Sequence, residues 1–286
     1  MPASRTWLLI LSAFGALVAC SSSSDESKVN GGGGNGSSGN SGIVVDPTPN
    51  PTAGGTGSPP PETDVTVVIT ADNAYGFGYG TDTNIINYFG GVENIRSEDI
   101  FSCPIGKGPE TYTVPAAKAN AGAYLYIVGY ADKSTTQGVI AKFFRDGAAP
   151  VFTGTGPWQG CATGIDFDPG TGGPSLEVIN QQIAACNGGK TDPATTSGGW
   201  VGTAQSSNGR IVFGEDNSTE RDQPVVGNEF KIACDIDSAA HWMWFDWEPN
   251  RSSGSAFLWP GGTGNPTKDF LIFRLGADSI PEAPPK

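Results

Sequence analysis

Residues 65–80 read Val-Thr-Val-Val-Ile-Thr-Ala-Asp-Asn-Ala-Tyr-Gly-Phe-Gly-Tyr-Gly (VTVVITADNAYGFGYG). The first six residues are all β-branched, which is typical of a strand. The chain then passes Asp72 and Asn73 and resumes with Tyr75, Phe77 and Tyr79 at every second position, so the three rings lie on one face of an extended strand. Two strands that meet at a short polar corner predict a β-sheet protein.

Strand signals of the same kind recur along the chain between glycine, proline and asparagine turns. They are found at 111–114, 123–131, 138–144, 209–213, 241–245 and 269–275. We find no internal repeat and no alternation of strands with helices, which would indicate a parallel sheet. The sequence therefore predicts an all-β fold, an antiparallel β-sandwich of jelly-roll type, with a short helical and loop insertion near 158–240.

One helix is predicted within that insertion, at 174–186. Apolar residues recur there at spacings of three and four, as they do on one face of a helix. They are Leu176, Ile179, Ile183 and Cys186. Asn187-Gly188-Gly189 then supplies a helix stop. If Cys186 faces inward, a disulfide at this position would pin the helix to the sheet.

The N-terminal residues predict an export signal. Residues 7–19 form an apolar run of 13 residues, shorter than the ~20 that cross a bilayer and typical of a signal peptide. Leu17-Val-Ala-Cys20 follows and resembles the lipobox of bacterial lipoproteins. The resemblance implies that cleavage leaves an acylated Cys20 as the membrane anchor, in the cell envelope at the outer membrane or cell surface. An ordinary secretory signal with an incidental cysteine is the alternative.

Three regions follow from this pattern: a lipoprotein signal peptide at 1–19, a tether at 20–61 and a folded domain at 62–286. The tether is rich in serine, glycine and proline, including four serines at 21–24 and four glycines at 31–34. Such a tract buries too little apolar surface to offset its chain entropy, so we expect it to be disordered.

The charge balance is acidic. The formal net charge is −13, and it becomes −14 if the signal peptide is removed, because Arg5 is the only charge within it. An acidic protein does not attract phosphate backbones, so we expect no nucleic-acid partner. We expect the lipid on Cys20, and not a basic surface, to hold the protein to the membrane.

Four cysteines remain beyond the lipobox, namely Cys103, Cys161, Cys186 and Cys234. An even number in an oxidising compartment predicts two disulfides, for which three pairings are possible. Cys161–Cys186 closes the shortest loop between neighbours and would leave Cys103–Cys234. Zinc is disfavoured, because structural sites use closely spaced ligand pairs, whereas the sequence has no Cys-x-x-Cys motif and a single histidine, His241.

The order of several segments resembles galactose-binding-like jelly-roll modules, which accompany many glycoside hydrolases. The segments are Ala71-Asp-Asn73, Tyr112-Thr-Val-Pro115, 123–132, 137–141 and His241-Trp-Met-Trp244. The resemblance covers about 62–145 and 238–275 and implies binding of a glycan or cell-surface polysaccharide. The chain departs from the pattern at Gly76-Phe-Gly-Tyr-Gly-Thr81, where these modules carry a Val-Asn-Gly hairpin, and in the insertion.

Sugars stack their C–H faces on aromatic rings and need polar side chains at the rim for their hydroxyls. The predicted ligand-binding residues are Asp72, Asn73, Tyr75, Tyr79, Trp242, Trp244 and Trp247. A second interpretation stays open, in which the alternating rings and the tryptophans belong to the core and Asp72-Asn73 forms an Asx turn. Loop tryptophans Trp158, Trp200 and Trp259 are further candidates, because an exposed tryptophan is costly unless it binds something.

Asp166 and Asp168 lie beside glycines as the ligands of calcium loops often do, so a structural calcium is a possible cofactor; solvated acidic turns are the alternative. No other cofactor is indicated.

Catalytic motifs are missing: His241 has no Gly-x-Ser-x-Gly partner for a serine triad, and we assign no catalytic residue. The favoured function is a non-catalytic surface lipoprotein that binds carbohydrate. One alternative is a glycoside hydrolase or lyase that uses two carboxylates among Glu215, Asp216, Asp246 and Glu248. The other alternative is a structural or partner-binding surface protein.

Overall fold

The computed structural model describes residues 63–94, 97–103, 108–130, 136–163, 165, 170, 172–189, 198–218, 230–246, 256–258 and 270–284. Residues Gly57–Lys286 form one compact unit. The predictions made for the signal peptide and tether, and for Cys20, Asp166, Asp168, Trp247, Glu248 and Trp259, lie outside the described residues.

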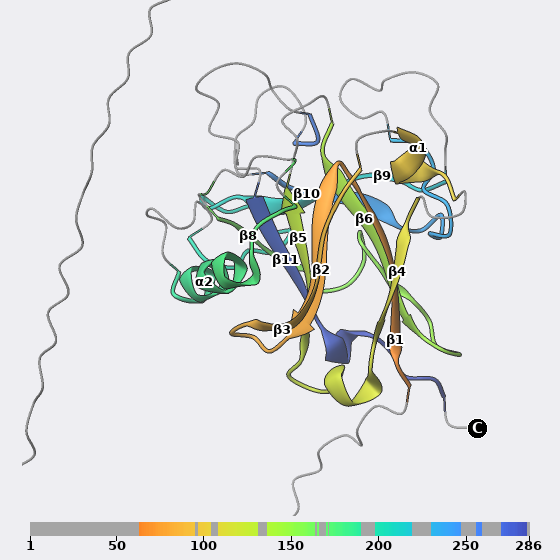
Figure 1. Ribbon diagram of the computed structural model, residues 1–286, viewed down its shortest axis with the longest axis horizontal. Coiled ribbons are helices and arrows are strands. Elements are labelled where there is room, and N and C mark those ends of the chain that lie inside the picture. Colours follow the sequence, from red (N-terminus) through yellow and green to blue (C-terminus); the bar gives the residue numbers. More distant parts are fainter. Residues whose placement is uncertain are drawn as a thin grey trace, which may run out of the picture. The chain divides into compact units, whose positions relative to one another are not determined.

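The unit is built from two antiparallel sheets that face each other (Figure 1). Sheet A has the order β4 (Glu110–Val114), β1 (Val65–Asp72), β6 (Gly138–Arg145), β10 (His241–Asp246) and β9 (Arg210–Asp216), and β7 (Val151–Phe152) pairs with β6. Sheet B has the order β3 (Ile85–Glu93), β2 (Ala74–Gly80), β5 (Tyr124–Tyr130), β11 (Phe270–Gly276) and β8 (Gln159–Ala162). The predicted all-β antiparallel sandwich is confirmed, and its jelly-roll type stays a prediction.

The helical elements are short. They are α1 (Ser97–Phe101), α2 (Leu176–Asn187) and the 3₁₀ turns η1 (Ala116–Lys118) and η2 (Ala277–Ser279). Among the described residues, no helix is both long and apolar enough to cross a bilayer.

The corner at Asn73 carries the chain from sheet A to sheet B, since β1 ends at Asp72 and β2 begins at Ala74. The side chains of β2 then alternate. Its three rings join the cluster between the sheets, whereas Gly76 and Gly78 face the ring of Tyr88 from the neighbouring strand β3. The strand is thus buried on both faces, because glycine leaves room for that ring on the outer side.

Helix α2 covers the outer face of sheet B. Ser175 caps its N-terminus by accepting a hydrogen bond from the Val178 amide, 3.3 Å from the hydroxyl oxygen. Ile179 and Ile183 of the predicted stripe are buried with Val128 and Ile272 of the sheet. The helix is confirmed, and it starts two residues later than predicted because Ser175 provides the cap.

Both disulfides have the pairing that loop length favoured, Cys161–Cys186 and Cys103–Cys234. The first joins β8 to the end of α2 and so fixes the helix to the sheet, as expected. The segment near 158–240, predicted as an insertion, also supplies an edge strand to each sheet, β8 and β9.

The sequence reading missed the edge strand β3. Two of its large apolar side chains, Ile86 and Phe89, are 58 and 49 % exposed. Its inward and outward residues therefore do not alternate between apolar and polar, which is the pattern that identifies a half-buried strand. Helix α1 and the short strands β7 and β8 were missed as well, because two to five residues carry little periodicity.

The packing of β2 predicts that Gly78→Ala destabilises the fold. A Cβ atom at this position would lie 2.7 Å from the carbonyl oxygen of Asn87 and 2.7 Å from Cγ2 of Ile85. Overpacking against backbone costs about 1–3 kcal/mol. Gly202→Ala is the matched control, since a Cβ atom there would lie 3.9 Å from the carbonyl oxygen of Trp158, an ordinary van der Waals contact. Urea unfolding at equilibrium should show a lower midpoint for Gly78→Ala alone, and equal midpoints for the two variants would contradict this packing.

Candidate functional site

The rings of Tyr75, Phe77 and Tyr79 lie between the sheets and are 0, 0 and 8 % exposed. Phe77 packs against Tyr112 of β4, with ring centroids 5.0 Å apart, and against Phe143 of β6 at 6.3 Å. Rings on the inner face of a sandwich are enclosed by both sheets. Tyr75 and Phe77 therefore do not form the predicted surface platform, and the core interpretation is the correct one.

Tyr75 instead makes a polar network at the edge of the core. Its hydroxyl donates to Glu110 Oε2 at 2.7 Å and lies 2.9 Å from the hydroxyl of Tyr112. Burial raises the pKa of Tyr75 well above the ordinary value, and burial likewise raises the pKa of Tyr112. Burial also raises the pKa of the Glu110 carboxyl, although the hydrogen bond from Tyr75 acts in the opposite direction. Desolvation disfavours the charged form of each group.

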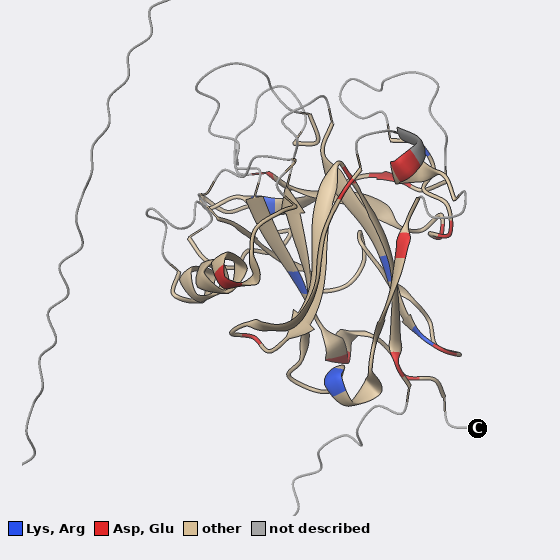
Figure 2. Cartoon of the chain, in the orientation of Figure 1, with Lys and Arg blue, Asp and Glu red and all other residues tan. Residues whose placement is uncertain are grey.

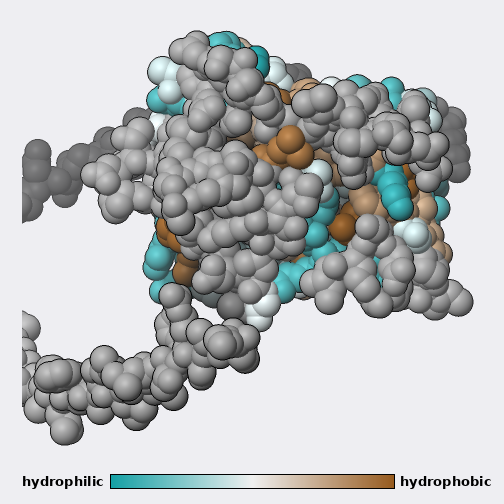
Figure 3. All heavy atoms as spheres, turned by 90° about the horizontal axis from the view of Figure 1, so that it is seen from above, coloured by the Kyte–Doolittle hydropathy of each residue, from teal (hydrophilic) through white to brown (hydrophobic). Residues whose placement is uncertain are grey.

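Asp72 and Asn73 fasten the corner of the chain. Asp72 is 7 % exposed and accepts a hydrogen bond from the hydroxyl of Thr136. The side-chain amide of Asn73 donates to the backbone carbonyl of Asn94 at 3.3 Å. The backbone N–H of Asn94 in turn donates to the backbone carbonyl of Asn73 at 2.7 Å. The pair thus joins the β1–β2 corner to the end of β3. Figure 3 looks down on this end of the sandwich, where hydrophobic and hydrophilic described residues lie side by side.

Trp242 and Trp244 are 0 and 1 % exposed. Trp242 stacks on Phe230 with ring centroids 4.0 Å apart, and Trp244 lies 6.2 Å from Phe273 of the opposite sheet. The predicted binding wall on β10 is therefore a core wall, because sheet B covers one face and the chain around Phe230 covers the other. His241 is partly buried, and its Nδ1 is 2.9 Å from the carbonyl oxygen of Gly214.

A surface cleft of about 320 Å³ opens where β2 and β3 meet the loop between η1 and β5. Tyr79 is the predicted ligand residue that lines it, beside the exposed side chain of Ile86. Asn87 of β3, Lys118 of η1 and Asn120 add polar groups to the lining. The cleft therefore combines an apolar wall with amide and ammonium groups, and Figure 2 shows the basic residue of η1 at this end of the sandwich.

A tight turn places the amide of Asn120. The amide of Ala123 donates to the Asn120 carbonyl at 3.0 Å, and Gly122 has a φ of 83°, which glycine adopts without strain. The side-chain nitrogen of Asn120 donates to the Ala117 carbonyl at 3.1 Å. The side-chain oxygen of Asn120 takes no part in this hydrogen bond. The sequence reading missed Asn120 and Lys118; the Asn-Ala-Gly turn was the signal available, but turns of this kind are common.

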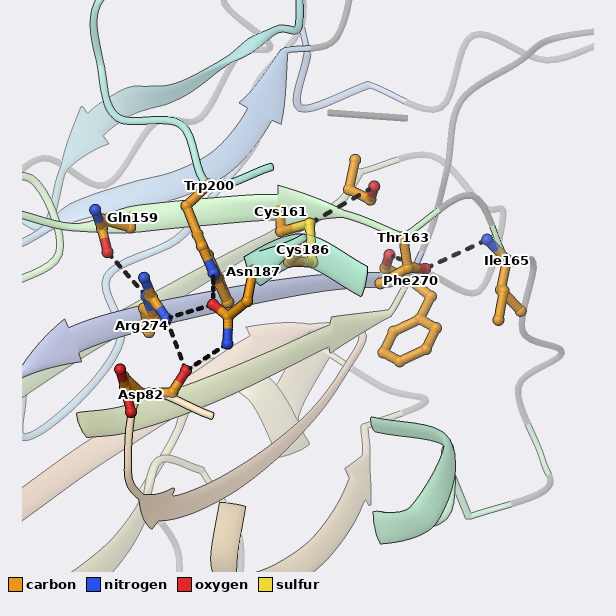
Figure 4. Close-up of a disulfide and its surroundings, with 11 residues drawn as sticks. Asp82, Gln159, Cys161, Thr163, Ile165, Cys186, Asn187, Trp200, Phe270 and Arg274 are labelled. Carbon is orange, nitrogen blue, oxygen red and sulfur yellow. Dashed lines mark hydrogen bonds between the residues drawn. A yellow bond between two sulfur atoms is a disulfide. The ribbon is translucent and has the colours of Figure 1, made fainter. Parts of the chain in front are cut away.

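Beside the cleft, Arg274 of β11 organises a second group of side chains (Figure 4). Its guanidinium carbon lies 3.8 Å from the ring centroid of Trp200 and 4.7 Å from that of Tyr124. Its Nε donates to Gln159 at 2.8 Å. The indole N–H of Trp200 donates to Asn187 Oδ1 at 2.6 Å. Trp200, a predicted loop candidate, is therefore half-buried and fixed in orientation, whereas Trp158 is buried and donates to a backbone carbonyl.

The side chains around Arg274 also fix the turn between β2 and β3, which borders the cleft. The carbonyl of Asp82 accepts from Arg274 Nη1 at 3.2 Å and from Asn187 Nδ2 at 2.8 Å. Asn187 follows Cys186, which the disulfide to Cys161 ties to β8. Since Thr81 lines the cleft, the disulfide, Arg274 and Asn187 together fix one wall of it.

Metal-ligating side chains meet at a different place. The described residues bring Cys103, Cys234 and Asp235 together, and the two cysteines form a disulfide.

The carboxylates considered for hydrolysis do not line the cleft. Asp246 is 5 % exposed, and its Oδ2 is 3.8 Å from Nη2 of Arg210. Asp216 accepts a hydrogen bond from the backbone N–H of Ser218 at 3.1 Å.

Comparisons with models of protein families, with curated proteins and with solved structures find no match to this chain. What the site binds is therefore inferred from its own residues.

The raised pKa of Glu110 predicts a pH-dependent stability. The folded carboxyl holds its proton to higher pH than the unfolded one, so its contribution to stability is lost as pH rises from the ordinary value of about 4.3 through the raised value. Glu110→Gln keeps the shape but cannot ionise. Urea unfolding across mildly acidic to neutral pH should show the free energy of unfolding of Glu110→Gln rising relative to wild type as pH increases, and parallel curves would contradict the raised pKa.

Proposed function

We propose that this chain is a non-catalytic carbohydrate-binding lipoprotein of the cell surface, and that the cleft beside Tyr79 is its sugar site. The observation that carries the proposal is the composition of that cleft. Tyr79 and Ile86 give it an apolar wall, and Asn87, Lys118 and Asn120 surround that wall with hydrogen-bonding groups.

This arrangement fits the two-sided chemistry of a pyranose. The C–H face of a sugar packs on apolar side chains, while its hydroxyls need both donors and acceptors. Two side-chain amides supply both, and the lysine ammonium supplies donors only. A volume of about 320 Å³ lies at the lower end of the range for small-ligand sites, which suits one or two sugar residues.

The N-terminal pattern supports the proposed location. An acylated Cys20 would anchor the protein in the cell envelope, and the tether at 20–61 would hold the domain away from the membrane. A galactose-binding-like jelly roll remains the type of sandwich that the sequence pattern favours.

Hydrolysis by this cleft is less well supported. A glycosidase of the usual kind needs two carboxylates across the scissile bond, and the residues that line the cleft are neutral or basic. A partner-binding surface protein is the second candidate, because Ile86 and Phe89 are strongly exposed on the edge strand β3. Exposed edge strands are templates for pairing with another chain.

A glycan array probed with residues Gly57–Lys286 tests the proposal, followed by calorimetry with the retained glycan. Removing an amide or ammonium hydrogen bond costs about 1–3 kcal/mol, so Asn87→Ala and Lys118→Ala should each weaken binding about fivefold or more. Asn208→Ala and Lys231→Ala are matched controls, since both side chains are exposed and neither residue is among those that line the cleft.

Retention of no glycan, or equal affinity of the cleft and control variants, would overturn the proposal. Loss of a co-purifying protein on Ile86→Ser, with no glycan bound, would favour the partner-binding candidate instead.

A further inference from the structure

The disulfide Cys103–Cys234 lies at the surface beside an aspartate. The ligand atoms of Cys103, Cys234 and Asp235 all lie within 4.8 Å of one another, and Cys103 Sγ is 3.4 Å from Asp235 Oδ2. We propose that reduction of this disulfide by a small thiol opens a binding site for a thiophilic divalent cation such as Zn²⁺. The two thiolates and the Asp235 carboxylate are its protein ligands.

The chain holds these residues together without the sulfur–sulfur bond. The Cys234 amide donates to the Phe101 carbonyl at 3.0 Å, which ties the two cysteine segments through their backbones. The buried Asn217 side chain fixes the second segment: it donates to the carbonyls of Ala233 and Ile236 at 2.8 and 2.7 Å. It also accepts from the Ala233 amide at 2.8 Å. The cysteine Cα atoms, 5.8 Å apart, therefore stay close when the disulfide opens.

The distances suit a tetrahedral ion. Two sulfurs bound to one Zn²⁺ at ~2.3 Å lie ~3.8 Å apart, and a carboxylate oxygen binds at ~2.0–2.2 Å. Side-chain rotation alone can bring the sulfurs from bonding distance to that separation. Cys103 and Asp235 are exposed, so water can complete the coordination.

Access and charge favour the site. Asp235 lines an open groove of about 520 Å³ on the outer face of sheet A. Lys142 in the same groove is paired with Asp237 at 2.9 Å, which offsets its repulsion of a cation. The net charge of −13 attracts cations at longer range.

Selective reduction follows from burial. Cys161 and Cys186 are 0 and 1 % exposed beneath the group in Figure 4, whereas Cys103 is exposed. Thiol exchange requires direct attack on a sulfur. A reducing thiolate therefore reaches Cys103–Cys234 first.

The reaction balances without another reagent. One thiolate attacks a sulfur of Cys103–Cys234, which gives a mixed disulfide and one protein thiolate, and a second thiol releases the other cysteine. The reductant leaves as its own disulfide. Binding of the divalent ion to two thiols then releases two protons.

The test uses the chain from residue 20 onward with Cys20→Ser, reduced under mild conditions by a phosphine, which leaves no competing thiol. Mass spectrometry after thiol alkylation should locate two new thiols at Cys103 and Cys234 while Cys161–Cys186 stays oxidised. Co²⁺ is the probe: one equivalent should give the thiolate-to-cobalt charge-transfer absorption, and Zn²⁺ should abolish it.

Asp235→Asn should weaken Co²⁺ binding about tenfold or more. Asp146→Asn is the matched control and should leave the affinity unchanged, because Asp146 is exposed and belongs neither to the cysteine–aspartate group nor to the groove lining. A Cys103→Ser/Cys234→Ser variant reports folding without the disulfide by circular dichroism, and it should be folded but give no absorption. Reduction at Cys161–Cys186 first, unfolding of the serine variant, no charge-transfer band, or equal affinity of the two aspartate variants would each overturn the proposal.

Discussion

Burial of β2 on both faces is the constraint on which the rest of the fold depends. Its rings fill the space between the sheets, and its glycines let Tyr88 of β3 lie against the outer side. This close approach brings the outer face of sheet B within reach of α2, whose Asn180 side chain accepts from the Ile85 amide at 2.8 Å and donates to its carbonyl at 3.1 Å. Asn180 thus occupies the backbone groups of the edge strand at Ile85, which protects that point from pairing with another chain.

The same alternation sets where the candidate site can be. The rings of β2 on the inner face of sheet B are enclosed along most of the strand and cannot contact a ligand. Tyr79, at the end of the strand, is the ring that lines the cleft. The site therefore belongs to the loops and turns at this end. Their positions depend on long-range ties, because Arg274, Asn187 and the Cys161–Cys186 disulfide fix the β2–β3 turn from three separate parts of the chain.

The sequence predicted most of the central strands, α2 and both disulfides, because periodicity and loop length are local properties. It did not predict β3, since an edge strand with exposed Ile86 and Phe89 breaks the alternation. The tryptophans of β10 could be read as a binding wall or as core, and a strand apolar on both faces gives no way to decide. The cleft was missed because Tyr79, Asn87 and Lys118 come from three elements that only the fold brings together.

The two disulfides illustrate the same limit in chemical terms. Both looked alike in the sequence, and the absence of closely spaced cysteine pairs argued against zinc. The fold gives the two disulfides different surroundings. Cys161–Cys186 is buried under α2, whereas Cys103–Cys234, whose partners are separated by 131 positions in the sequence, lies at the surface beside Asp235. A ligand set divided between segments so far apart has no spacing motif. It depends on the backbone bond from Cys234 to Phe101, which is a property of the sandwich and not of either segment alone.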